Sequence, residues 1–401
     1  MNPILRDARI LVADDQVDVA KTLCHPLRAA GAVVRQVADG QQALDEVLLG
    51  GYDLLILDMK MPPDDWGGLW VLERLKDAGS RLPVMALSGE GGQRQTVQAL
   101  RLGAKNWIFK EDAFSELEPL CTALLEGAHA EAFEGIAAIG PSPLAHRFAR
   151  YRAAPPGRVV TEGLRAFEGV IQFAALLGLA TLEPAEAGPL RGFSADQIAR
   201  PSLGTWNSLL NALRPAAVPG SAFSTLCRAL SPHKKSTQDM RSLVKLRNDI
   251  AHSGYEPTDD DSNALRRFLV EAAHRITSNW PWQVGVATSM DYDGAAFDVQ
   301  TLCFIGLGQP RPVVYRSNLP IRSGTVLLLR GDGSAPVSVS PWFSSVDGVL
   351  HVLDGIKQRR RSQPDPVAPM LFADPITGNR DVEVLADPGA NWSRLDSWID
   401  G

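Results

Sequence analysis

The sequence predicts a multidomain chain in which a doubly wound α/β domain is followed by an all-α helical bundle and a small β-rich domain. Three observations predict this order. Apolar runs alternate with amphipathic helical periods over the first 125 residues, and helical periods alone occupy 158 to about 280. Short β runs separated by Gly and Pro follow. A length of 401 residues suits about two to four such domains.

The first domain, residues 1–125, is predicted from strands and helices in strict alternation. Five short runs rich in apolar residues predict strands at Arg9–Ala13, Val33–Val37, Leu54–Leu57, Val84–Leu87 and Asn106–Phe109. Helical periods follow at Val17–Ala30, Gln41–Leu49, Leu69–Ala78, Gln93–Leu102 and Phe114–Leu125. Fully apolar strands indicate a parallel sheet covered on both faces. The functional residues of such a sheet are expected at the carboxyl ends of its strands.

The remaining segments change in character. Residues 126–157 are rich in Ala, Gly and Pro and are interpreted as a linker with some helical content. A bundle over 158–281 is predicted from helices at Val160–Leu179, Leu203–Leu213, Ala222–Leu230, Thr237–His252 and Asp260–Trp280. The β-rich domain, 282–401, has β runs at Trp282–Ala287, Phe297–Phe304, Pro312–Arg316, Thr325–Leu329, Val337–Ser340 and Val349–Leu353. The basic run Lys357–Ser362 is interpreted as a solvated turn rather than a nucleic-acid patch.

Composition narrows the classes of function. There are 40 basic and 46 acidic side chains, a net charge of −6, and no segment is the basic stripe of a general nucleic-acid binder. Four scattered cysteines argue against a zinc module or a disulfide scaffold. The longest apolar stretch, 169–182, is too short to span a bilayer, and the charged N-terminus is unlike a secretory signal. We expect a cytoplasmic protein with no membrane partner.

Polar residues end several predicted strands. Asp14 and Asp15 follow the first strand, Asp58 ends the third, and the last two strands end at Ser88 and Lys110. Because three adjacent carboxylates repel one another, a hard cation such as Mg²⁺ is expected among them. With Lys110 it would neutralise a phosphoryl group that a carboxylate takes up. The alternative, in which these aspartates are only loop acids and helix caps, does not explain why matching residues end four strands.

Residues 8–120 resemble a response-regulator receiver domain, a flavodoxin-like fold, through DD at 14–15, ILDMKMP at 56–62, LSGEGG at 87–92 and GAKNWIFK at 103–110. The resemblance implies that Asp58 is the phosphoacceptor and that Asp14, Asp15, Asp58 and the backbone carbonyl of Lys60 hold Mg²⁺. It also implies that Ser88 and Lys110 contact the phosphoryl group, and that Trp107 is the aromatic switch residue. In two departures, the loop PPDDWGG is longer and more acidic than usual, and Glu111 replaces the common proline. The longer loop is expected to alter access by the partner kinase.

A second, shorter motif lies in the bundle. The segment SLVKLRNDIAHSGYEP places Arg247 five residues before His252, which resembles the RNxxxH signature of HEPN-family domains. Some members of that family are metal-independent ribonucleases that act as dimers, and others only bind or scaffold. Five residues turn a straight helix by about 140°, so a joint site needs a bent helix end or two facing copies. A buried network that orders the bundle is the alternative to a catalytic role.

The sequence thus predicts a response regulator phosphorylated on Asp58 by a sensor histidine kinase, with dimerisation bringing two bundles together. Two outputs stay open: an RNA nuclease built from Arg247 and His252, and a non-enzymatic adaptor whose helical and β domains recruit a protein. Whether the output is an enzyme is therefore undecided. DNA binding is disfavoured because no basic recognition helix is apparent after residue 126.

Overall fold

The computed structural model describes residues 2, 4–89, 92–183, 190, 193, 197, 200–230, 234–332, 334–356, 370–380 and 382–384. The described chain forms two compact units. The first is Met1–Glu131, with which 232–239 and 256–264 also group, and the second contains the remaining residues. The basic run Lys357–Ser362 lies outside the described residues.

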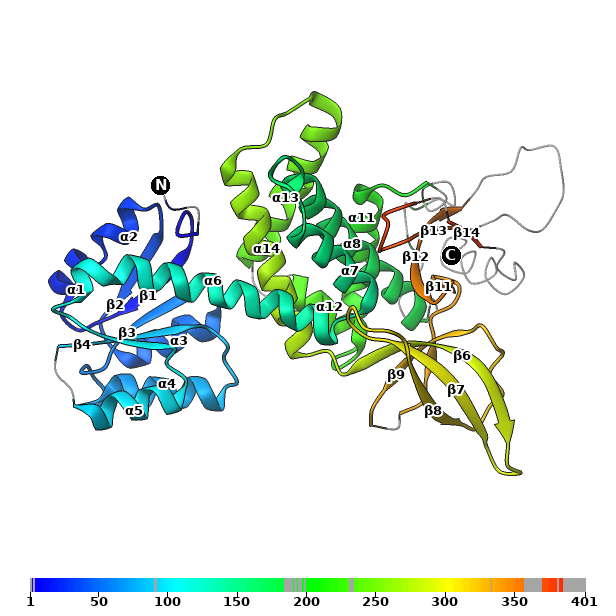
Figure 1. Cartoon of the computed structure of the whole chain (residues 1–401), viewed down its shortest axis with the longest axis horizontal. Coiled ribbons are helices and arrows are strands. Elements are labelled where there is room, and N and C mark those ends of the chain that lie inside the picture. The colour runs from blue at the N-terminus through cyan, green and yellow to red at the C-terminus, as the bar shows by residue number, and fades with distance from the viewer. Residues whose placement is uncertain are drawn as a thin grey trace. The chain divides into compact units, whose positions relative to one another are not determined.

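The first unit is built on a five-stranded parallel sheet in the order β2-β1-β3-β4-β5 (Figure 1). Its strands are β1 (Arg9–Ala13), β2 (Val33–Val37), β3 (Leu54–Asp58), β4 (Val84–Ser88) and β5 (Asn106–Phe109). Its helices are α1 (Val17–Leu23), α2 (His25–Ala29), α3 (Gly40–Leu49), α4 (Gly67–Asp77), α5 (Gln93–Leu102) and α6 (Ala113–Ile139), the last of which runs beyond Glu131. The predicted doubly wound α/β fold is confirmed, and this strand order is the flavodoxin-like one.

Both faces of this sheet are buried along its central strands, whereas the edge strand β2 is partly exposed. Ile10 and Val12 of β1 pack on α1, α2 and α6, through residues such as Leu27 and Leu117. Their neighbours in the strand point the other way and pack on α3, α4 and α5. Successive side chains of a strand alternate between faces, so one short run supplies two cores.

One helix of the first unit differs from its prediction. The sequence predicts a single helix over 17–30, whereas the structure has α1 and α2, with Cys24 between them. Pro26 is the physical reason, because it has no N–H to donate to the carbonyl one turn earlier. A proline is instead accommodated in the first turn of a new helix, where it lies in α2.

The segment expected as a linker, 126–157, is largely helical. Helix α6 continues to Ile139, and α7 (Ser142–Arg152) and the short helix η1 (Pro156–Arg158) follow. Alanine favours helix, and several large apolar residues of this segment are buried: the rings of Phe133 and Phe148 lie 6.0 Å apart. The helical content of the segment is therefore higher than its composition suggested.

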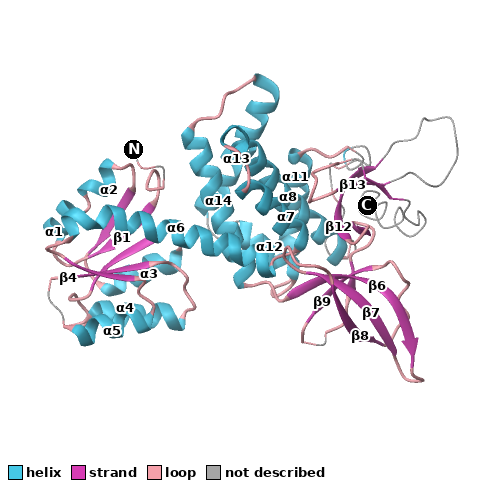
Figure 2. Cartoon of the chain, viewed as in Figure 1, coloured by secondary structure: helices cyan, strands magenta, loops and turns pink. Residues whose placement is uncertain are grey.

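The second unit combines helices with two antiparallel sheets (Figure 2). Its further helices are α8 (Val159–Thr181), α11 (Leu203–Leu213), η2 (Arg214–Ala216), α12 (Ala222–Leu230), α13 (Lys234–Ser253) and α14 (Asp259–Ser278), the last two of which have their first residues grouped with the first unit. One sheet has the order β10-β9-β6-β7-β8 and the other β11-β12-β13-β14. The strands are β6 (Trp282–Tyr292), β7 (Phe297–Phe304), β8 (Arg311–Ser317), β9 (Val326–Arg330), β10 (Val337–Ser338), β11 (Phe343–Val346), β12 (Val349–Ile356), β13 (Met370–Ala373) and β14 (Val382–Val384).

Helix α8 is the centre of the second unit. Phe173 on α8 contacts Trp280 after α14, with ring centroids 6.2 Å apart, and Phe343 of β11, with centroids 5.2 Å apart. The four-stranded sheet therefore shares a core with the helices. The helical run Pro156–Thr181 is long and apolar enough to cross a membrane, but 89% of its apolar window is buried in the protein, as in the core helix of a soluble domain.

Candidate functional site

The carboxyl edge of the parallel sheet brings together the residues that the sequence singled out. Asp14 and Asp15 directly follow β1, Asp58 is the last residue of β3, Ser88 ends β4 and Lys110 follows β5. Asp14, Asp58 and Ser88 are each at most 1% exposed, whereas Asp15 is exposed to solvent. The strand ends therefore form a cluster of polar side chains that is buried except at Asp15.

Lys110 is paired with two carboxylates at once. Its Nζ lies 2.8 Å from Asp14 Oδ2 and 2.9 Å from Asp58 Oδ2. Backbone N–H groups donate to the other oxygen of each carboxylate. The Gln16 N–H donates to Asp14 Oδ1 at 2.9 Å, and the Lys60 N–H donates to Asp58 Oδ1 at 3.3 Å. These bonds fix the direction of both buried carboxylates.

The protonation of the pocket follows from burial and pairing. Burial raises the pKa of Asp58, and the negative charge of Asp14 adds to the rise, while the bond to Lys110 opposes it. Burial alone would lower the pKa of Lys110, but its bonds to Asp14 and Asp58 raise it overall. Lys110 is therefore held in its charged form. Added positive charge would stabilise the ionised form of the neighbouring Asp58 carboxylate.

The pocket has the donor set of a hard divalent cation. Asp14, Asp15 and Asp58 each offer a carboxylate oxygen, and these atoms lie within 4.8 Å of one another. Three carboxylates against the single Lys110 ammonium leave the formal charge negative, and all the ligand atoms are oxygen, which suits Mg²⁺. The acidic group expected from the sequence is thus present, and Mg²⁺ fits its chemistry.

The backbone around the end of β3 is tightly packed. A Cβ atom on Gly67 would lie 2.1 Å from the Met61 carbonyl oxygen, and one on Gly68 would lie 2.5 Å from the carbonyl oxygen of Asp58. Only glycine fits at such distances. The first turn of α4 therefore rests directly on the chain that carries Asp58.

Trp107 lies in β5, three residues before Lys110. Its indole is partly buried against the core formed by α3, α4 and α5, and its ring meets that of Phe109 edge-on at 6.4 Å between centroids. No hydrogen-bond partner of its indole N–H lies among the described residues. The residue expected as the switch is thus held by packing.

The comparisons with known proteins agree with this geometry. Residues 10–121 match the family model described as "Response regulator receiver domain". Residues 10–121 are a response regulator receiver domain. Receiver domains typically bind Mg²⁺ at an acidic group such as Asp14, Asp15 and Asp58. The candidate residues from Asp14 to Lys110 lie within this span, whereas Arg247 and His252 lie outside it.

Several curated proteins are similar to the receiver part of the chain. The probable transcriptional regulatory protein SilR of Salmonella typhimurium is 33% identical over 109 residues, which are 27% of this chain and 47% of SilR. The transcriptional regulatory protein DltR of Streptococcus agalactiae is 34% identical over 27% of this chain and 48% of DltR. The response regulator MprA of Mycobacterium ulcerans is 32% identical over 39% of this chain and 65% of MprA. The chain thus spans about half the length of the first of these relatives.

Among solved structures, the receiver domain of NtrX from Brucella abortus is 31% identical to this chain. It matches 29% of this chain and 98% of its own, with a TM-score of 0.28. A Francisella response regulator receiver domain is 24% identical, over 30% of this chain and 98% of its own, with a TM-score of 0.28.

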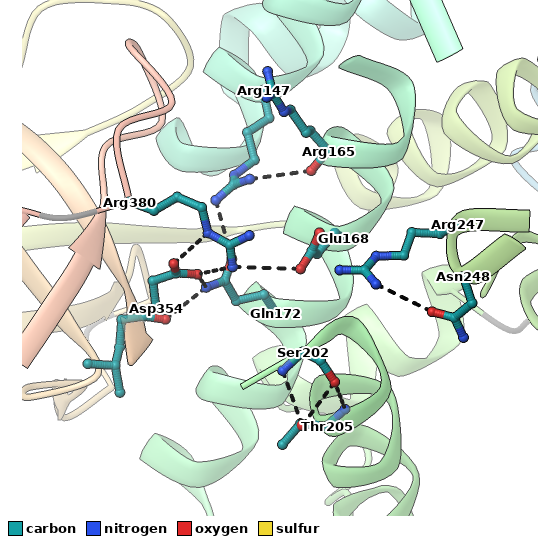
Figure 3. A network of polar contacts seen from close by, with 11 residues as sticks. Arg147, Arg165, Glu168, Gln172, Ser202, Thr205, Arg247, Asn248, Asp354 and Arg380 are labelled. Carbon is teal, nitrogen blue, oxygen red and sulfur yellow. Dashed lines mark hydrogen bonds and ion pairs between the residues drawn. The ribbon is translucent and has the colours of Figure 1, made fainter. Parts of the chain in front are cut away.

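The candidate residues of the second unit are arranged differently. Arg247 and His252 both lie in α13, which stays helical to Ser253, so they project about 140° apart around its axis. His252 is exposed, while Arg247 is partly buried, donates to Asn248 Oδ1 at 3.4 Å and extends toward α8 (Figure 3). One copy of the chain therefore does not bring the two side chains to one face.

Sequence reasoning missed a polar cluster in the second unit (Figure 3). The Arg147 guanidinium of α7 donates to Gln172 Oε1 at 3.2 Å, and the Gln172 amide donates to the Leu353 carbonyl at 2.8 Å and to Asp354 Oδ1 at 3.0 Å. Arg380 in turn binds Asp354 through two nitrogens, at 2.6 and 2.7 Å. These residues span more than half of the sequence, and no local spacing connects them.

Proposed function

We propose that the chain is a cytoplasmic response regulator in which Asp58 accepts a phosphoryl group from the phosphohistidine of a sensor kinase. An Asp58 carboxylate oxygen attacks phosphorus, the P–N bond breaks, and its electron pair returns to the imidazole of the kinase. The observation that carries this proposal is the Lys110–Asp58 contact at 2.9 Å beside Asp14 and Asp15.

The residues around Asp58 have distinct tasks in this step. Lys110 pairs with the phosphoryl oxygens once they replace its carboxylate partner, and the Ser88 hydroxyl binds another of them. Mg²⁺, held by Asp14, Asp15, Asp58 and the Lys60 carbonyl, would neutralise the remaining charge of the phosphoryl group. Phosphorylation shifts the domain between two conformational states, and Trp107 changes its position between them and so alters the surface of the domain.

The test is phosphorylation of the whole chain by acetyl phosphate with Mg²⁺. Intact-mass analysis is expected to show one phosphoryl group on the wild type and none on Asp58→Asn. Asp77→Asn, which removes an exposed carboxylate at the end of α4, serves as the control and is expected to match the wild type. A wild type that takes up no phosphoryl group, or an Asp58→Asn variant that does, contradicts the proposal.

For the output, the arrangement of the second unit supports the adaptor over the nuclease. Arg247 and His252 face different ways, so an RNA-cleaving site needs two copies of the chain facing each other. Strand β8 pairs with β7 alone among the described strands, and it exposes Val314 by 57%. An open edge with exposed apolar residues suits recruitment of a protein partner.

The two outputs are separated by an RNA cleavage assay on the chain treated with beryllofluoride and Mg²⁺, a combination that mimics phosphorylation. The nuclease hypothesis expects cleavage by the wild type that is lost in Arg247→Ala and in His252→Ala. The adaptor hypothesis expects no cleavage by any of the three. The relatives SilR and DltR are named as transcriptional regulators, so binding to duplex DNA is measured in the same experiment.

A further inference from the structure

The receiver domain carries a cavity of about 480 Å³ that is separate from the phosphoacceptor pocket. It lies between α4, α5 and the loop that leads into α4, and we call it the acidic groove. Its walls combine carboxylates with indole rings and leucine side chains: Asp64, Asp65, Trp66, Trp70, Glu73 and Leu102. This groove includes the loop whose length and acidity depart from the family pattern.

The carboxylates of the acidic groove have no cation of their own. In the part of the chain that the structure describes, none of Asp64, Asp65 and Glu73 takes part in an ion pair or side-chain hydrogen bond. All three are exposed around an aromatic surface. Three negative charges beside two indoles give a site that attracts a cation with a flat apolar face.

The structure itself shows which cation fits such an indole. The guanidinium of Arg74 lies over the ring of Trp70, 5.7 Å from its centroid. An indole has two faces, and Trp66 adds a second ring to the groove. A guanidinium stacks on aromatic rings and binds carboxylates with two parallel hydrogen bonds, which an ammonium does not.

The groove is held open by the backbone. The Gly67 N–H donates to the Met61 carbonyl at 3.1 Å and to the Asp64 carbonyl at 3.1 Å, and the Pro62 carbonyl accepts from Gly40 at 2.8 Å. With the glycine contacts described above, these bonds fix the loop before α4, so little ordering is needed when a ligand enters.

We propose that the acidic groove binds an arginine side chain carried on a basic segment of a partner protein. The guanidinium stacks against Trp66 and Trp70, and it pairs with the carboxylates of Asp65 and Glu73. The volume of the cavity accommodates one such side chain together with part of the segment that carries it. This site is independent of phosphoryl uptake by Asp58.

In the experiment, the full chain is titrated with a short capped peptide that contains two arginines, and binding is measured by isothermal titration calorimetry. The matched peptide replaces both arginines by citrulline, which keeps the planar shape and removes the charge. We expect the arginine peptide to bind about tenfold more tightly than the citrulline peptide, and to weaken as salt is added. A peptide with lysine in place of both arginines is expected to bind about threefold or more weakly than the arginine peptide.

Variants locate the binding on the groove. The double variant Asp65→Asn with Glu73→Gln, and separately Trp70→Leu, are each expected to weaken the arginine peptide by about fivefold or more. Asp77→Asn removes one charge from α4 outside the groove and is expected to change affinity by less than about twofold. Circular dichroism of each variant shows that the fold is retained.

Three results overturn the proposal. They are the absence of arginine-peptide binding to the wild type, equal binding of the citrulline peptide, and unchanged binding by the folded groove variants. Because none of these measurements uses phosphorylation, a failure here is distinct from a failure of phosphoryl uptake by Asp58.

Discussion

Lys110 Nζ lies 2.9 Å from Asp58 Oδ2, so the carboxylate at the end of β3 is bonded to a cation that follows β5, two strands away in the sheet. The same nitrogen lies 2.8 Å from Asp14 Oδ2. One side chain thus ties together the ends of three strands of the receiver domain. The pair is buried, which makes it sensitive to the loss of either partner.

We predict that Lys110→Met destabilises the receiver domain in the absence of Mg²⁺. The substitution leaves the buried Asp14 and Asp58 carboxylates facing each other without a cation, and a loss of about 2–4 kcal/mol in the free energy of unfolding is expected. Denaturant unfolding in EDTA, followed by circular dichroism, measures it.

Added Mg²⁺ is expected to recover part of the stability lost in Lys110→Met, because it supplies positive charge to the same carboxylates. The control is Lys21→Met, an exposed lysine in the last turn of α1. Equal stability of Lys110→Met and the wild type in EDTA would show that the buried pair contributes nothing to the fold.

Asp15→Asn is predicted to weaken Mg²⁺ binding without harming the fold. Asp15 is exposed and its carboxylate is a member of the acidic group. At about ten times the dissociation constant, Mg²⁺ stabilises the wild-type receiver domain by about 1.4 kcal/mol. Thermal unfolding with and without Mg²⁺ is expected to show this gain in the wild type and little of it in Asp15→Asn. A gain that persists in the variant would place the ion elsewhere.

The sequence was sufficient for the receiver domain because its signals are local. Each strand of the parallel sheet is a short apolar run, and the site residues directly follow these runs, so Asp58 and Lys110 could be placed at one edge although 52 positions separate them. The break between α1 and α2 was missed because the helical periodicity continues across Pro26. In that case the missing N–H of proline overrides the apolar pattern.

The second unit resisted prediction because its contacts are not local. Gln172 reads from the sequence as a lone polar residue in an apolar helix, and nothing near it indicates a bond to the Leu353 carbonyl, 181 positions away. The motif at Arg247 and His252 was visible, but its spacing does not tell whether the two side chains act together. The cavity beside Trp70 was also hidden, because it depends on how α4 and α5 pack.

We predict that Gln172→Leu destabilises the second unit. The Gln172 amide donates to the Leu353 carbonyl and to Asp354, and its oxygen accepts from the partly buried guanidinium of Arg147 (Figure 3). Leucine has a similar volume but removes all three bonds, although Asp354 keeps Arg380 as a partner, and the loss is expected to cost about 1–3 kcal/mol. Denaturant unfolding monitored by tryptophan fluorescence measures the loss, and a change below about 0.5 kcal/mol would show that the bonds are readily replaced by water.

The last prediction concerns pH and His146 on α7. Burial lowers the pKa of His146, and the nearby Asp374 opposes this only partly. A histidine with a lowered folded-state pKa binds fewer protons in the folded than in the unfolded state, so its contribution to stability is present above the ordinary pKa of 6.5 and is lost as the pH falls below it. The second unit is therefore expected to lose stability between about pH 7 and about pH 5. Thermal unfolding across this range is expected to show a weaker pH dependence in His146→Gln than in the wild type, whereas the same substitution at the exposed His252 serves as the control. If the unfolding temperature falls equally with decreasing pH in His146→Gln and in the wild type, the acid sensitivity belongs to other groups.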